Sequence, residues 1–138
     1  MTIRQISVFL ENTSGRIAEA AGLLGDSGIN LRAATIADTA DFGILRLIVD
    51  DPERAMALFK EAGFTAKGTD VFAVEVDDVP GGFAAVMKMF YNNDVNIEYF
   101  YTSLERGTEK AVIIFRIEDT GHGSEILKRH GIHTVSKF

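Results

Sequence analysis

The 138-residue sequence predicts an α+β protein made of two βαββαβ units, residues 1–69 and 70–138. The first observation behind this prediction is an internal repeat, because the segment 12–17 recurs at 78–83, an offset of 66 positions. A second match, near the end of each half, has an offset of 68 positions. The second observation is that strand-like and helix-like apolar periodicities alternate in the same order in both halves. Right-handed connections then place both helices of each unit on one face of an antiparallel sheet.

The first half supplies the elements of the unit in order. Alternating apolar residues at Ile6, Val8 and Leu10 predict the first strand. Helical spacing predicts two buried stripes, which are Ile17, Ala20, Ala21 and Leu24, and then Ala55, Leu58, Phe59 and Ala62. Pro52 begins the second helix, and Gly28 and Gly63 end the two helices. The predicted bounds are strand 5–10, helix 16–27, strand 31–37, turn 38–41, strand 42–49, helix 52–62 and strand 64–67.

The second half repeats this order of elements. Its predicted bounds are strand 71–76, helix 81–92, strands 96–101 and 110–117, helix 122–130 and strand 132–135. The junction at Gly68 and Thr69 is too short for a flexible linker, so we expect the two units to pack closely. Strand pairing across the units would give one eight-stranded sheet with four helices on one face.

Composition excludes several classes of partner and site. The net charge of −6, without any cluster of Lys and Arg, argues against nucleic acid and anionic membranes as partners. The chain has no cysteine, which excludes disulfides, thiolate metal sites and cysteine nucleophiles. Its three histidines do not complete a metal-binding pattern, so we expect no metal and no cofactor. Without a signal-like N-terminus or a long apolar run, we expect a cytoplasmic protein that spans no membrane.

A short motif occurs once in each half at matching spacing. After the first strand comes Asn/Asp-x-Ser/Pro-Gly, then a helix, and then Gly/Asp-Ile/Val-Asn-Leu/Ile. This arrangement resembles the ACT domain, an amino-acid-sensing module attached to many biosynthetic enzymes. The resemblance covers both halves, so the chain is similar to a tandem ACT protein without a catalytic domain. It implies two ferredoxin-like units side by side.

The resemblance also implies a ligand between paired ACT units. In that family the ligand is contacted by the loop after the first strand, the start of the first helix and the asparagine that follows the helix. The matching positions are Asn12, Ser14, Gly15, Arg16 and Asn30 in the first half, and Asp78, Pro80, Gly81, Gly82 and Asn96 in the second. Gly82 stands where the first half has Arg16, and Asp78 replaces Asn12. We therefore expect two sites of different affinity, or a single competent site.

These residue types suit a free amino acid. The start of a helix offers unpaired N–H groups and a partial positive charge to a carboxylate, and glycine there allows a close approach. An Asn amide donates and accepts hydrogen bonds, which suits a zwitterion. The structural alternatives are that Asn12 and Ser14 cap a helix, that Asn30 and Asn96 only complete turns, and that Arg16 is a solvated first-turn residue.

The expected function is binding of a free amino acid or close analogue by a regulatory module without catalysis. The alternative is a regulatory subunit that docks on a biosynthetic enzyme such as acetohydroxyacid synthase, whose regulatory subunits also carry an ACT unit. Unpaired sheet edges are compatible with a homodimer. An enzyme of the acylphosphatase type would use Arg16 and Asn30, but the second half lacks the arginine and no glycine-rich phosphate cradle is present. No nucleophile, base and orienting partner occur together in the sequence.

Overall fold

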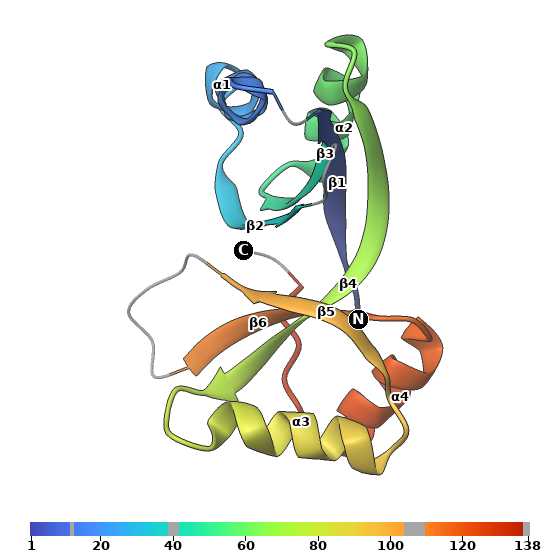
Figure 1. Ribbon diagram of the computed structural model, residues 1–138. Coiled ribbons are helices and arrows are strands. Elements are labelled where there is room, and N and C mark those ends of the chain that lie inside the picture. Colours follow the sequence, from blue (N-terminus) through green and yellow to red (C-terminus); the bar gives the residue numbers. More distant parts are fainter. Residues whose placement is uncertain (12, 39–41, 104–109, 137–138) are drawn as a thin grey trace. The chain divides into compact units, whose positions relative to one another are not determined.

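The computed structural model describes residues 1–11, 13–38, 42–103 and 110–136 (Figure 1). The elements in chain order are β1 (Ile3–Glu11), α1 (Arg16–Asp26), β2 (Leu31–Asp38), β3 (Phe42–Val49), α2 (Pro52–Glu61), β4 (Thr65–Asp77), α3 (Gly82–Asn92), β5 (Ile97–Thr102), β6 (Lys110–Ile117) and α4 (Thr120–Arg129). The predicted α+β class is confirmed, with antiparallel strands and the βαββαβ order in the first half, while the second half starts on β4 and continues through α3, β5, β6 and α4. Most of the predicted turn 38–41 lies outside the described residues.

Sheet pairing corrects one expectation. The described strands follow the order β2-β3-β1-β4-β6-β5, which is six strands and not eight. The predicted strands 64–67 and 71–76 are one continuous strand, β4, because no proline or reverse turn interrupts the backbone between them. In place of the predicted strand 132–135, the described residues after α4 form a bridge between Thr134 and Val74. Its hydrogen bonds run from the Val135 N–H to the Ala73 carbonyl at 2.8 Å and from the Glu75 N–H to the His133 carbonyl at 3.1 Å.

The chain divides into two compact units, Arg4–Thr69 and Asp70–Lys137, the second joined by Met1–Ile3. In the first unit α1 and α2 cover one face of the strands (Figure 1). Its core contains Ile6, Val8, Leu10, Ala20, Leu24, Ile29, Leu45, Leu47, Val49, Ala55, Phe59 and Phe64. The predicted helix stripes were too wide, since Ile17 is 53% exposed and Ala21 and Ala62 are exposed. Only one narrow side of each helix meets the sheet.

The second unit has its own core under α3 and α4. It contains Phe72, Val74, Val76, Val86, Phe90, Val95, Ile113, Phe115, Ile117, Ile126 and Leu127. The Phe90 and Phe115 rings meet edge to face with centroids 5.5 Å apart. Phe100 is half exposed, but its ring contacts Phe83 at 4.9 Å on the helix-covered side of the sheet. Phe100 of β5 therefore contributes to packing within this unit.

All four helices end in the same way. The C′ residue has a left-handed backbone, and the next residue donates a backbone hydrogen bond to the carbonyl five residues earlier, which is the Schellman arrangement. The C′ residues are Gly28, Gly63, Asp94 and Gly131, with φ angles of 71°, 85°, 56° and 66°. The predicted helix stops at Gly28 and Gly63 are confirmed. Asp94 adopts this conformation without being glycine, which Asp tolerates better than most residues.

Candidate ligand-binding site

The four helices begin in two different ways. α2 and α4 are capped by aspartate side chains, since Asp51 Oδ1 and Asp119 Oδ1 accept first-turn N–H groups at 3.3 and 3.0 Å. α1 and α3 instead begin at Gly15 and Gly81, whose φ angles are 89° and 87°, and the described residues supply no side-chain cap. The first N–H of each of these helices donates to a backbone carbonyl, Arg16 to Thr13 at 3.5 Å and Gly82 to Val79 at 3.0 Å. The first-turn N–H groups that follow have no side-chain cap from the described residues and can meet an external acceptor.

The other predicted loop residues surround these two helix starts. Ser14, Asp78 and Pro80 are exposed, while Asn12 lies outside the described residues. Ser14 forms no cap, so the alternative that it serves as the N-cap is wrong. The reason is that Gly15 occupies the N-cap position itself and turns the chain with a left-handed backbone, which costs glycine little.

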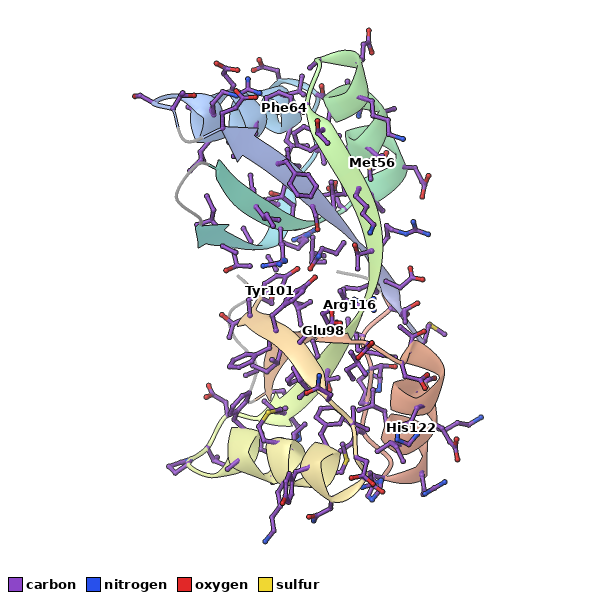
Figure 2. The ribbon with its side chains drawn as sticks, turned by 45° about the vertical axis from the view of Figure 1, so that its right-hand side comes forward. Met56, Phe64, Glu98, Tyr101, Arg116 and His122 are labelled. Carbon is purple, nitrogen blue, oxygen red and sulfur yellow. The ribbon has the colours of Figure 1, made fainter. Side chains whose placement is uncertain are left out.

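Arg16 is not the solvated residue that the sequence suggested. Its side chain is 22% exposed, and its guanidinium lies over the Phe64 ring, 4.3 Å from the centroid. Nη1 donates to Glu19 Oε2 at 2.6 Å, and Nε lies 3.3 Å from Glu11 Oε2 as an ion pair without hydrogen-bond geometry. Phe64 lies just before β4, beside α1 (Figure 2). Arg16 therefore satisfies its charge within its own unit.

Asn30 and Asn96 lie at the opposite ends of the two helices from the glycine loops. α1 and α3 have 11 residues each, which corresponds to a length of about 16 Å. Within one unit the loop and the asparagine are therefore too far apart to touch the same small ligand. The same separation keeps Arg16 and Asn30 from sharing one phosphate within their unit. The acylphosphatase-like arrangement is thus not formed by this pair.

The two asparagines have different surroundings. The Asn30 N–H donates to Asp50 Oδ1 at 3.1 Å, and the Asp50 N–H donates to the Asn30 carbonyl at 3.2 Å, which fixes the backbone and leaves the side-chain amide exposed. Asn96 borders a cavity of about 560 Å³. The cavity is lined by Asp94, Val95, Asn96, Ile117, Glu118, Asp119, Thr120 and His122. Of these, the sequence prediction had included only Asn96.

One signal in the sequence could have found part of this cavity. Asp119 stands 68 positions after Asp51, and both cap the second helix of their unit. The offset would have placed the start of α4 at Thr120 and not at His122. His122, labelled in Figure 2, lies on α4, and its Nε2 is 2.9 Å from the carbonyl oxygen of Asn93. Because Asn93 ends α3, this hydrogen bond connects α3 with α4.

A second cavity lies at the start of α3. It has a volume of about 290 Å³ and is lined by Glu75, Asp77, Gly82, Ala85, Val86, Lys110, Gly131, Ile132 and His133. Gly82 is required by the fold of the loop, because a Cβ at this position would overlap the backbone carbonyl oxygen of Asp77. The Lys110 Nζ forms an ion pair with Asp77 at the rim. Gly82, one of the residues predicted for the site, therefore lines this cavity at the start of α3.

With this geometry established, the chain can be compared with known proteins. The family model described as an ACT domain pair matches residues 1–137. The chain belongs to this family. No functionally curated protein is significantly similar to this ACT pair.

Solved structures agree with the family assignment. Protein BT0572 from Bacteroides thetaiotaomicron is 37% identical to this ACT pair, with 98% of this chain and 92% of that chain covered and a TM-score of 0.92. The regulatory subunit of aspartate kinase from Thermus thermophilus is 17% identical, with 91% of both chains covered and a TM-score of 0.65. The corresponding subunit from Thermus flavus is 15% identical, with 93% and 90% covered and a TM-score of 0.62. The two Thermus structures share the fold of this ACT pair.

Neither a metal-binding cluster nor a membrane-spanning helix occurs among the described residues. In the ranges that the structure describes, no three His, Asp or Glu side chains are grouped so as to hold a metal ion. None of the described helices combines the length and the apolarity that a membrane crossing demands.

Proposed function

We propose that this ACT pair is a regulatory module that binds a free amino acid or a close analogue and carries out no chemistry itself. The observation that carries the proposal is the contrast between the helix starts. α2 and α4 have side-chain caps, whereas α1 and α3, which follow the first strand of each unit, begin at left-handed glycines, and beyond the first N–H of each helix their first-turn N–H groups have no cap from the described residues. Such groups bind a carboxylate through hydrogen bonds and the partial positive charge of the helix.

The remaining polar positions extend this proposal. The loop residues Ser14, Gly15, Asp78, Gly81 and Gly82, together with Asn12, Arg16 and Pro80, are proposed to shape the ligand positions at the helix starts. Asn30 and Asn96 are proposed as ligand contacts at the other ends of the same helices. Their exposed amides offer both donors and acceptors to a zwitterion. The cavity beside Asn96 is large enough for an amino acid, whose pockets commonly start at about 300 Å³.

The proposed absence of catalysis follows from chemistry at the same positions. Arg16 is already engaged by Glu11, Glu19 and Phe64, and Asn30 lies a helix length away. An acyl phosphate would therefore find no paired arginine and asparagine within that unit. We expect no hydrolysis of acyl phosphates above the buffer rate. A reproducible rate that is abolished in Arg16→Ala would contradict a pure binding module.

A thermal-shift screen of the twenty free amino acids tests the proposal directly. A ligand that binds only the folded state raises stability by about 2.7 kcal/mol at one hundred times Kd. We expect at least one amino acid to raise the melting temperature in a saturable manner, and the corresponding D-isomer to have a smaller effect. If no amino acid and no close analogue shifts the melting temperature, the proposal fails.

A second candidate function is a regulatory subunit that docks on an amino-acid biosynthetic enzyme. The observation that favours it is the shared fold with aspartate kinase regulatory subunits from two Thermus species over nearly the whole length of each chain. A ligand sensor and a docking subunit differ in whether a partner enzyme is needed to observe their activity. A sensor shows its thermal shift alone, whereas a subunit changes the activity of a partner enzyme that is added to it.

A further inference from the structure

The two repeats differ in what fills the space beside the first helix of each unit. In the first unit this space is occupied by the Arg16 side chain. Its guanidinium is held by Glu11 at 3.3 Å, by Glu19 at 2.6 Å and by the face of the Phe64 ring at 4.3 Å. A positively charged group of this chain is thus bound between the end of β1, the first turn of α1 and the turn that follows α2.

In the second unit the corresponding residue has no side chain. Gly82 stands at the Arg16 position, and the space beside it is the cavity of about 290 Å³. The cavity is lined by the counterparts of the three arginine partners, with Asp77 for Glu11, Ala85 for Glu19 and Ile132 for Phe64. The structure supports this correspondence, because both helices start at a left-handed glycine and both later turns have a left-handed glycine before the apolar residue.

The charges around the cavity are mixed but suit one kind of ligand. Asp77 keeps the carboxylate that Glu11 supplies in the first unit, and Glu75 is a further carboxylate in the lining. Lys110, which forms an exposed ion pair with Asp77, and His133 are the basic groups that line it. The Gly82 N–H at the start of α3 donates to the Val79 carbonyl at 3.0 Å, and the first-turn N–H groups that follow have no side-chain cap from the described residues. A cation therefore has Glu75 to pair with and can compete with Lys110 for Asp77, and a carboxylate has these first-turn N–H groups.

We infer that this cavity binds a basic amino acid, with its guanidinium or ammonium group placed where the first unit holds the guanidinium of Arg16. The inference deepens the proposed function and rests on it, because it names the chemical class of the ligand at one of the proposed positions. It also assigns a stoichiometry of one basic ligand per chain at this kind of position, since Arg16 itself fills the equivalent space in the first unit.

Calorimetric titration of the full chain with L-arginine, L-lysine and L-citrulline tests the inference. Citrulline has nearly the shape of arginine but no positive charge. We expect arginine or lysine to bind with one site per chain, and citrulline to bind at least about tenfold more weakly, because its ureido group still donates hydrogen bonds but forms no ion pair with a carboxylate. Equal affinity for arginine and citrulline, or no binding of either basic amino acid, would overturn the inference.

Three variants locate the site. Ala85→Glu restores the counterpart of Glu19 and should tighten arginine binding about two- to fivefold, as expected of an added exposed ion pair. Ala84→Glu adds the same charge on the same helix turn, but Ala84 does not line the cavity, so it serves as the matched control. Asp77→Asn should weaken arginine binding about tenfold. Equal effects of the two glutamate variants, or no effect of Asp77→Asn in a folded protein, would place the cation elsewhere and overturn the inference.

The same titrations separate this inference from the proposed function. Binding of a neutral or acidic amino acid, without binding of a basic one, leaves the amino-acid-binding proposal standing and overturns the ligand class. Absence of binding by all twenty amino acids overturns both. Circular dichroism and the melting temperature of each variant without ligand verify that altered binding reflects the cavity and not the loss of the fold.

Discussion

The two repeats differ at one equivalent position in the space that is available to a side chain. Arg16 places a long cationic side chain against Phe64, whereas Gly82 leaves no room for even a Cβ beside the Asp77 carbonyl. The surrounding turns are otherwise alike, with Gly15 and Gly81 at φ angles of 89° and 87°. One substitution between the repeats therefore changes both the backbone of the loop and the space next to it. This difference explains why the repeated motif does not imply two equal sites.

Gly82→Ala should destabilise the second unit. The added Cβ would overlap the Asp77 carbonyl oxygen, so the backbone of the loop must shift. Such overpacking typically costs about 1–3 kcal/mol. Gly121→Ala is the matched control, because its Cβ would make only an ordinary contact at 3.5 Å and alanine favours a helix. Urea denaturation should show a lower free energy of unfolding for Gly82→Ala only, and equal stability of the two variants would contradict the loop geometry.

Replacement of Asn30 or Asn96 by alanine tests whether these residues bind ligand or only complete turns. Both side chains are exposed, so we expect the variants to remain folded. If the amides bind charged groups of the ligand, each loss is worth roughly 1.5–3 kcal/mol, or about ten- to a hundredfold in affinity. The measurement is calorimetry with the amino acid that the thermal-shift screen identifies.

Asn93→Ala provides the contrast for this experiment. The Asn93 side chain donates to the Met89 carbonyl at 2.8 Å, which is a structural hydrogen bond at the end of α3. Its loss should lower stability by about 0.5–1.5 kcal/mol and leave affinity unchanged. If Asn30→Ala and Asn96→Ala bind as tightly as the parent chain, the asparagines are turn residues and belong outside the site.

At the scale of the elements, the caps divide the helices into two functional kinds. The second helix of each unit has an aspartate cap, and the first helix of each unit does not have a side-chain cap from the described residues. The second helices are therefore closed at their starts by aspartate side chains, whereas in the first helices only the first N–H has a backbone partner before the helix and the following first-turn N–H groups have no cap from the described residues. This division follows the repeat, so it is a property of the fold of each unit and not of one loop.

Cap removal should accordingly affect stability at the second helices only. Asp119→Ala and Asp51→Ala should each lower the free energy of unfolding by about 0.5–2 kcal/mol, because the loss of the side-chain oxygen leaves a first-turn N–H without its acceptor. Ser14→Ala should change stability by less than about 0.5 kcal/mol, because Ser14 does not cap α1. Denaturant unfolding of the three variants gives the comparison. A loss at Ser14 as large as that at Asp119 would contradict the assignment of the caps.

The sequence predicted the elements well where local chemistry determines them. The bounds of β3 and β6 matched, and the helix stops at Gly28 and Gly63 followed from the left-handed conformation that glycine favours. The division of β4 into two strands was wrong, because residues such as Gly68 and Thr69 suggest a break but remain compatible with extended backbone. Strand pairing joins segments that are far apart in the sequence, so a local sequence pattern does not predict it.

For the whole molecule, the family assignment was accessible from the sequence because the motif occurs twice at matching spacing. The site was accessible only in part. The sequence pointed to the glycine loops as proposed ligand positions, but the cavities depend on groups from separate segments, such as Asn96 with His122 or Gly82 with Ile132. The engagement of Arg16 by Phe64 joins residues 48 positions apart, which a local motif cannot indicate. Three-dimensional proximity thus decides which of the matching positions remain available.

The central claim is that the starts of α1 and α3 in this ACT pair bind an amino acid. Two-dimensional NMR of the labelled chain, titrated with each of the twenty amino acids, tests it most directly because every backbone N–H reports its own surroundings. We predict that a binding amino acid produces its largest saturable shifts at the N–H groups of Gly15, Arg16, Gly81, Gly82 or their loop neighbours. Saturable shifts confined to residues away from both loops, or none with any amino acid, would contradict the claim.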